Sequence, residues 1–306
     1  MKRALVTGGS GFLGSHIVDS LAKRGLEVVV FDTKASDWLK PGCEMVEGSI
    51  LDQGAILAAM DGCDVVYHLA AVADLDEAVQ DPVRTAEVNI IGTVRVLEAA
   101  RTLKLKRFAY ASTVYVYSDS GSFYRTSKRA CELMIEDYRE RYGLPYTILR
   151  FGSVYGPRAD HHNPVYGLLR QALTKGRIDH PGSGKEIREY IHVKDAAEAA
   201  ADILAPDFEN ENILLTGRER MTTREMLEMV REILGGGVEL NFRDEHRAGH
   251  YVQTPYNYTP KLGKKLQRAT YVDLGLGLLD CIQDLDARQG REPETIVLPE
   301  RDGETS

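Results

Sequence analysis

Residues 4–14 read Ala-Leu-Val-Thr-Gly-Gly-Ser-Gly-Phe-Leu-Gly, an apolar run that leads directly into a glycine-rich turn. Gly9, Gly11 and Gly14 have the spacing Gly-x-Gly-x-x-Gly, and Gly8 comes just before them. Glycines at these positions permit a tight turn, close approach of the backbone to a phosphate, and contact between strand and helix. The stretch therefore predicts a strand, a turn and a helix whose N-terminal amides can hold a pyrophosphate.

The second informative segment is Tyr124-Arg-Thr-Ser-Lys128. It places a phenol and an ammonium about one helical turn apart, so both side chains can face one ligand. The glycine turn alone predicts a nucleotide site. With a Tyr-x-x-x-Lys pair added, the sequence predicts that a hydride and a proton are moved on a molecule bound beside that nucleotide.

Apolar runs alternate with helical patterns along the first half of the chain. The expected strands are residues 4–7, 27–32, 44–47, 65–69, 108–112 and 146–150, and the expected helices are 14–24, 54–60, 81–100 and 124–142. This alternation predicts an α/β fold with a doubly wound parallel sheet of the Rossmann type. Further on, the pattern predicts helices over 164–175 and 223–234, a strand end and helix over 191–204, and a strand over 212–216.

Asp32 ends the second expected strand, where a carboxylate can accept hydrogen bonds from both ribose hydroxyls and repel a 2′-phosphate. NAD is therefore favoured over NADP, although Lys34 could offset part of that repulsion. We expect an NAD-binding domain over residues 1–160, to which 188–205 return. A smaller α/β substrate-binding domain is expected over 161–306, with a flexible tail from about residue 289.

Composition limits the possible partners. The formal charge is −8 over 306 residues, and no basic stripe offsets it, so neither a nucleic acid nor an anionic membrane is expected as a partner. The N-terminus enters the first strand almost at once, and no apolar run reaches the roughly 18 residues of a membrane span. We expect a cytoplasmic protein. The four cysteines lack Cys-x-x-Cys spacing and indicate neither zinc nor a disulfide framework: Cys43, Cys63, Cys131 and Cys281.

Over roughly residues 1–285 the chain resembles the extended short-chain dehydrogenase/reductases, in particular the nucleotide-sugar epimerases and dehydratases. The resemblance is carried by these segments: residues 7–14, Asp32, His68-Leu-Ala-Ala71, Val88-Asn-Ile-Ile-Gly-Thr93, Ala111-Ser-Thr113, Tyr124 with Lys128, Arg150, Val154-Tyr-Gly-Pro157 and Arg188-Glu-Tyr-Ile-His-Val193.

The resemblance implies roles for individual residues. It implies NAD contacts from Gly8, Gly11, Phe12, Leu13, Gly14, Asp32, Ser49, Ile50, Leu69, Ala70, Ala71, Asn89, Ser112, Tyr124 and Lys128. It implies catalysis by Thr113, Tyr124 and Lys128, and substrate contacts from Thr113, Ser153, Arg188 and Arg247. It also implies a homodimer formed through helices 82–100 and 124–142.

Tyr124 is expected to act as the base for a sugar hydroxyl. A phenol has a pKa of about 10 and is a poor base at neutral pH. We expect the Lys128 ammonium and the positive nicotinamide to favour the phenolate and bring this pKa toward the working pH. Thr113 aligns with the hydroxyl residue that hydrogen-bonds the reacting oxygen.

The residues after Thr113 indicate which reaction is expected. The related 4,6-dehydratases carry an acidic pair after Ser-Thr, and the related decarboxylases carry a glutamate; this chain has Val114 and Tyr115 there. The resemblance thus favours a 4-epimerase that acts on a UDP-hexose or related UDP-sugar through a transient 4-keto intermediate. A nucleotide-sugar reductase or dehydrogenase, and a non-catalytic NAD-binding regulatory protein, remain as alternatives.

Two departures from the family and one histidine pair also stand out. Ser49 replaces the usual aspartate near adenine, and the segment between Thr113 and Tyr124 is shorter than in most relatives. No metal is expected: His161-His162 is interpreted as a solvated loop, because no carboxylate or third histidine follows at ligand spacing.

Overall fold

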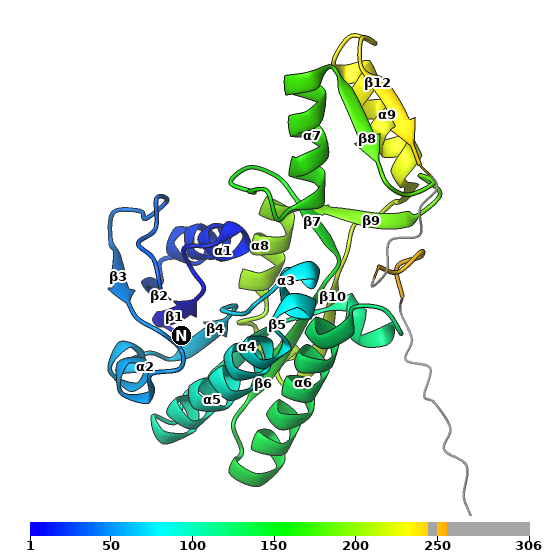
Figure 1. Cartoon of the computed structure of the whole chain (residues 1–306). Coiled ribbons are helices and arrows are strands. Elements are labelled where there is room, and N and C mark those ends of the chain that lie inside the picture. The colour runs from blue at the N-terminus through cyan, green and yellow to red at the C-terminus, as the bar shows by residue number, and fades with distance from the viewer. Residues whose placement is uncertain (244–249, 256–306) are drawn as a thin grey trace, which may run out of the picture. The chain divides into compact units, whose positions relative to one another are not determined.

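The computed structural model describes residues 1–243 and 250–255 (Figure 1). The chain divides into two units, Met1–Thr259 and Pro260–Ser306, and all the described residues belong to the first. Arg247 and the tail expected from about residue 289 lie outside the described residues. Within the described ranges, no helix has both the length and the apolar character that crossing a membrane requires.

The centre of the first unit is a sheet of seven parallel strands in the order β10-β6-β5-β4-β1-β2-β3. The chain runs outward from β1 to β3 and then crosses back to β4 on the other side of β1. This is the doubly wound order that the sequence predicts, and ligands bind beyond the strand ends at such a reversal. The strands are β1 (Arg3–Thr7), β2 (Glu27–Asp32), β3 (Cys43–Glu47), β4 (Val65–His68), β5 (Arg107–Thr113), β6 (Tyr146–Phe151) and β10 (Glu211–Leu215).

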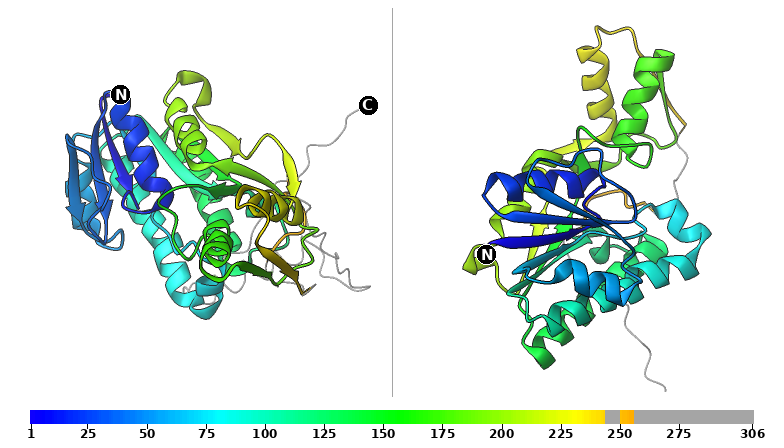
Figure 2. Two further views of the ribbon diagram at one scale, coloured as in Figure 1. Left: turned by 90° about the horizontal axis from the view of Figure 1, so that it is seen from above. Right: turned by 90° about the vertical axis from the view of Figure 1, so that its left-hand side faces the viewer.

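Helices cover both faces of the sheet (Figures 1 and 2). Leu5 packs with the helices of one face, whereas its neighbours Ala4 and Val6 pack with those of the other, because side chains alternate along a strand. One face is covered by α1 (Phe12–Lys23) and α8 (Val193–Asp202), and the other by α2 (Gln53–Met60), α5 (Gly92–Thr102) and α6 (Ser122–Tyr142).

The helix expected over residues 81–100 has an irregular centre. The chain forms α3 (Leu75–Gln80), α4 (Pro82–Ala86), a π-helical turn η1 (Glu87–Ile91) and then α5. Pro82 occupies the first turn as predicted. In the π turn the carbonyl of Asn89 accepts hydrogen bonds from Thr93 Oγ1 at 2.5 Å and Cys131 Sγ at 3.1 Å. Such turns often mark functional regions, and this one carries a residue that is expected in the site.

A smaller group of elements follows β6. Its strands form a three-stranded sheet in the order β11-β9-β7 and a pair of β12 with β8. Helices α7 and α9 pack together around Ala172, Ile178, Leu227 and Val238, apart from the helices of the main sheet (Figure 2). The elements are β7 (Ser153–Tyr155), α7 (Pro164–Lys175), β8 (Arg177–His180), β9 (Ile187–His192), β11 (Arg220–Thr222), α9 (Thr223–Ile233) and β12 (Glu239–Phe242). The short helical turn η3 (Pro206–Phe208) packs with the main sheet instead.

Two elements from the second half of the chain, β10 and α8, are part of the main sheet and its helical layer. Helix α8 packs beside α1, and β10 pairs in parallel with β6. The sequence predicts that residues 188–205 return to the first domain, and it predicts β10 within the 161–306 domain. The domain boundary near residue 160 stays a prediction.

Candidate active site

The glycine turn between β1 and α1 fits closely against the strand ends beside it. Gly8 has a φ of +71°, and its N–H donates to the Phe31 carbonyl at 2.9 Å. A Cβ on Gly14 would lie 2.1 Å from the Gly8 carbonyl oxygen, and one on Gly8 would lie 2.7 Å from the Ala70 nitrogen. Only glycine fits at either position. No side chain caps the N-terminus of α1, so the amides of Phe12 and Leu13 stand where a pyrophosphate is expected.

Asp32 faces this turn from the end of β2. The Ser10 N–H donates to its Oδ2 at 3.1 Å, and the Ser10 hydroxyl donates to the Lys34 carbonyl at 2.8 Å. The carboxylate is therefore fixed beside the glycines, as its expected role on the ribose requires. Ser49 follows β3 and accepts a hydrogen bond from the Leu51 N–H at 3.2 Å, which closes a local turn. Ile50 is buried against Gly92.

Asn89 links the loop after β4 to α6. Its Oδ1 accepts from the Val72 N–H at 2.7 Å, and its Nδ2 donates to the Val72 carbonyl at 3.0 Å and to Ser127 Oγ at 2.9 Å. The side chain is 1% exposed. Asn89 thus holds in place the segment Leu69-Ala-Ala71, which is expected to line the cofactor.

The structure brings Thr113, Tyr124 and Lys128 together. The Tyr124 hydroxyl is hydrogen-bonded to the side chain of Thr113, which ends β5. The Lys128 ammonium lies 5.8 Å from the centre of the Tyr124 ring and 4.8 Å from that of Tyr110. It donates to the Ala111 carbonyl at 2.8 Å, so the lysine is fixed with its charge beside the phenol.

Burial changes the pKa values of both members of this pair. Burial raises the pKa of Tyr124 to about 12, and its hydrogen bond with Thr113 offsets only part of that rise. Burial also lowers the pKa of Lys128 to about 8. In the protein by itself, desolvation of the phenolate thus outweighs the neighbouring ammonium. The expected lowering of the Tyr124 pKa also involves the positive charge of the nicotinamide, and it stays a prediction.

Behind this pair lies a buried ionic network that sequence analysis missed. The Ser112 hydroxyl donates to Glu132 Oε1 at 2.6 Å. Arg150 donates to both carboxylate oxygens of Glu132, from Nε at 2.9 Å and from Nη2 at 2.8 Å, and also contacts the Tyr117 hydroxyl. The available signals were the charge of Arg150 within a buried strand and a glutamate one helical turn after Lys128.

Arg188, an expected substrate contact, lies at the end of a row of three tyrosine rings, Tyr251, Tyr115 and Tyr124. Its guanidinium stacks 4.2 Å from the centre of the Tyr251 ring, and its Nη1 donates to the carbonyls of Ile187 and Val252 at 3.1 and 3.2 Å. Ser153 Oγ lies 3.5 Å from the Tyr251 hydroxyl. Ser153 and Arg188 are thus brought to one place, as expected.

Tyr115 is the middle ring of this row and connects Tyr251 to Tyr124, the expected base. Its ring lies 4.7 Å from that of Tyr251 and 6.5 Å from that of Tyr124, and its hydroxyl lies 3.2 Å from His250 Nδ1. Val114, its neighbour, is fully buried. The sequence does not predict Tyr251 as a site residue, because a contact between residues so far apart along the chain leaves no local pattern.

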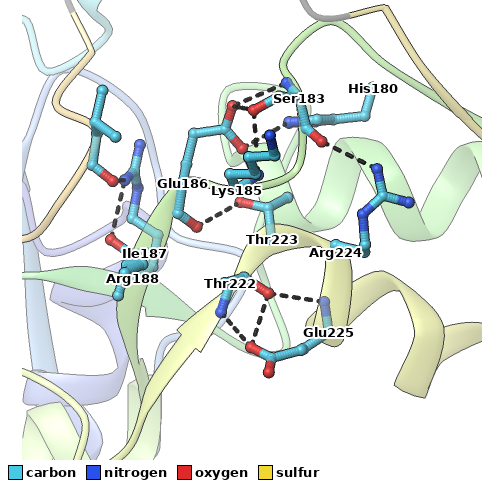
Figure 3. A network of polar contacts seen from close by, with 11 residues as sticks. His180, Ser183, Lys185, Glu186, Ile187, Arg188, Thr222, Thr223, Arg224 and Glu225 are labelled. Atoms are coloured by element: carbon cyan, nitrogen blue, oxygen red, sulfur yellow. Dashed lines mark hydrogen bonds and ion pairs between the residues drawn. The ribbon is translucent and has the colours of Figure 1, made fainter.

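The loop before β9 is fixed by Glu186 (Figure 3). Its Oε1 accepts from the Ser183 N–H at 3.1 Å, and its other oxygen lies 3.4 Å from His180 Nε2. Its carbonyl accepts from the Thr223 N–H at 2.9 Å. Burial opposes ionisation of this carboxyl, but hydrogen bonds and the charges of His180 and Arg188 outweigh burial and lower its pKa. The strand that carries Arg188 is thereby tied to α9.

The exposed loop after β7 gathers possible metal ligands. The ligand atoms of Asp160, His161 and His162 lie within 4.8 Å of one another. Asp160 precedes the two histidines in the chain, whereas the prediction of no metal depends on the residues that follow them. All three side chains are exposed.

The model of the NAD dependent epimerase/dehydratase family matches residues 4–213. The chain belongs to this family. Among curated relatives, the UDP-N-acetyl-alpha-D-glucosaminuronate decarboxylase of Bacillus cytotoxicus is 30% identical over 259 residues, which are 76% of this chain and 80% of the relative.

Two solved structures are also similar. The UDP-glucose 4-epimerase of Thermus thermophilus in complex with NAD is 32% identical with a TM-score of 0.74, covering 86% of this chain and 95% of that one. The UDP-glucose 4-epimerase of Thermotoga maritima with UDP-glucose is 28% identical with a TM-score of 0.77, and the match covers 84% of this chain and 90% of that one. The family resemblance and the fold expected from the sequence are thereby confirmed, and NAD is the cofactor. The turn at Gly8 and Gly14, which excludes any Cβ, fits such a dinucleotide.

Proposed function

We propose that this chain is a nucleotide-sugar 4-epimerase that acts on a UDP-hexose or a related UDP-sugar. The observation that carries the proposal is the grouping of Thr113, Tyr124 and Lys128, with Val114 and Tyr115 where related dehydratases and decarboxylases have carboxylates. Val114 is buried, and Tyr115 lies against Tyr124. These two positions therefore supply no carboxylate, neither the acidic pair of the related dehydratases nor the glutamate of the related decarboxylases.

Each residue of the group has a distinct task in this proposal. Tyr124 takes the proton from the C4 hydroxyl and later returns it, and Thr113 hydrogen-bonds the same oxygen. Lys128 keeps a positive charge beside the phenol, which favours the phenolate against the burial that disfavours it. NAD held by the glycine turn and Asp32 would supply the hydride chemistry, which is oxidation at C4 and reduction of the 4-keto sugar from its other face.

Arg188 is proposed to bind the substrate diphosphate. Its guanidinium is already oriented by Tyr251 and two carbonyl groups, so little side-chain freedom is lost when an anion binds. A planar fork of donors suits a phosphate group. Arg247 is proposed as a second ligand of the diphosphate. Ser153 is proposed to contact the sugar.

We propose further that the protein is a cytoplasmic homodimer. Helices α4 and α6 and the turn η1 expose large apolar side chains, among them Val83 (67% exposed) and Leu133 (48% exposed), as a helical interface between two copies would require. Free thiols at Cys43, Cys63 and Cys131 suit a reducing compartment.

The function is tested with a panel of UDP-sugars followed by NMR at the anomeric proton. A 4-epimerase converts one sugar of the panel to a mixture with its 4-epimer without added cofactor. Release of carbon dioxide, a stable 4-keto-6-deoxy product, or a requirement for added NAD in stoichiometric amounts would each assign a different reaction.

A further inference from the structure

The loop that joins β7 to α7 carries three consecutive side chains that can each bind a metal ion. Ligand atoms of Asp160, His161 and His162 all lie within 4.8 Å of one another. Asp160 Oδ1 accepts a hydrogen bond from the His162 N–H at 3.0 Å, and the ring centres of the two histidines are 3.9 Å apart. Local structure therefore gathers these side chains, and all three are exposed to the solvent from which an ion can enter.

A fourth side chain reaches this loop from a segment far away in the sequence. Asp74 precedes α3, and its Oδ1 accepts hydrogen bonds from the N–H groups of Asp76 and Glu77 at 2.9 and 2.8 Å. Its other oxygen, Oδ2, lies 3.7 Å from His162 Nδ1. One oxygen thus fixes the carboxylate at the start of the helix, and the other faces the imidazole ring.

This arrangement matches the way in which proteins hold a zinc ion. A histidine that binds a metal through one ring nitrogen usually has a carboxylate at the other nitrogen, which fixes the orientation of the ring. Asp74 stands at Nδ1 of His162 in this way and leaves Nε2 for the ion. Two imidazoles and one carboxylate suit Zn²⁺, whereas Mg²⁺ and Ca²⁺ prefer oxygen ligands alone.

The spacing of the ligand atoms also fits such an ion. In a tetrahedral zinc site, with bonds of about 2.0–2.2 Å, the ligand atoms lie about 3.4 Å apart. Exposed side chains can close from 4.8 Å to that spacing by rotation about their own bonds. Three protein ligands leave a fourth position, which water can fill.

We propose that Asp160, His161 and His162 bind a zinc ion and that Asp74 orients His162 for this purpose. The sequence-based expectation of no metal does not include Asp74, because this residue is distant along the chain. The ion would join two segments. Asp74 follows the segment that is expected to line the cofactor, and Asn163, directly after the cluster, caps α7 by accepting from the Val165 N–H at 3.1 Å. No step at the sugar involves the ion, so the inference does not rest on the proposed reaction.

The test is a calorimetric titration with Zn²⁺ of the full chain, prepared without a histidine tag and freed of metal by a chelator. The wild type should bind one ion. Asp74→Asn should weaken binding by about 10- to 100-fold, the usual cost of losing such a carboxylate. Asparagine caps a helix as well as aspartate does, so α3 should stay intact. Asp81→Asn is the matched control, because Asp81 caps α4 by accepting from the Arg84 N–H at 2.9 Å, and this variant should bind zinc like the wild type.

Two further variants test the ligands themselves. His161→Ala and His162→Ala change exposed side chains, so both should melt like the wild type, and each should lose more affinity than Asp74→Asn does. Titration with Co²⁺ should give the visible absorption of imidazole and carboxylate ligands without the strong ultraviolet absorption of thiolates, which excludes the free cysteines as ligands. Absence of zinc binding by the wild type, or equal binding by both histidine variants, would overturn the site. Wild-type binding by Asp74→Asn would overturn the role of Asp74.

Discussion

Replacement of Gly14 by alanine should damage both folding and cofactor binding. The added Cβ would lie 2.1 Å from the Gly8 carbonyl oxygen, 2.9 Å from the Gly8 carbonyl carbon and 2.9 Å from the Gly9 Cα. All three atoms belong to the backbone of the turn, so no side chain can move aside. Forcing an extra carbon into such a site costs about 1–3 kcal/mol of unfolding free energy. For a chain of 306 residues this lowers the melting temperature by roughly 2–5 °C.

Gly167→Ala is the matched control for this substitution. Gly167 lies within α7, and a Cβ there meets no atom within 4 Å. Alanine in a helix is more stable than glycine by about 0.5–1 kcal/mol, so this variant should melt slightly above the wild type. Melting is followed by circular dichroism, and bound NAD is measured after the protein is denatured. A Gly14→Ala protein that melts normally and retains NAD would refute the account of the turn.

Three further results follow from the site. Asp32→Ala should weaken NAD binding and reduce discrimination against NADP, measured by titration calorimetry; tighter binding of NADP than NAD by the wild type would overturn the role of this carboxylate. Turnover in heavy water should leave C5 of the sugar free of deuterium, because Val114 and Tyr115 replace the acidic pair; deuterium at C5 would indicate a dehydratase. Sedimentation at micromolar concentration should give a dimer that Leu133→Glu dissociates, whereas a wild-type monomer near 34.0 kDa would exclude the helical interface.

Local features of the sequence predict the glycine turn and the pairing of Tyr124 with Lys128. The glycine spacing places Gly8 and Gly14 where only a hydrogen atom fits. The helical spacing of Tyr124 and Lys128 brings their side chains together, and Tyr124 reaches Thr113. These relations depend on residues close together in sequence, or on strand ends that a parallel sheet must bring to one edge. The doubly wound order follows from the same alternation of strands and helices.

The remaining features depend on tertiary contacts that leave no local pattern. Tyr251 reaches Tyr115 from a segment far along the chain, and Glu132 meets Arg150 across the boundary between α6 and β6. The rise in the Tyr124 pKa depends on how fully the fold desolvates the phenol, which spacing does not reveal. The π turn at Asn89 has the same apolar periodicity as an ordinary helix, so the sequence predicted only the helix.

The most direct test of the proposed mechanism is the rate of 4-epimerisation by Tyr124→Phe, followed at the anomeric proton with the sugar that the wild type converts. The substitution keeps the ring and its contact with Tyr115 but removes the group that accepts the proton. Bound NAD and the melting temperature should be unchanged, while turnover should fall by about 10²–10⁴. Tyr142→Phe, at an exposed position of the same helix, should retain full activity. Wild-type turnover by Tyr124→Phe would contradict the assignment of Tyr124 as the base.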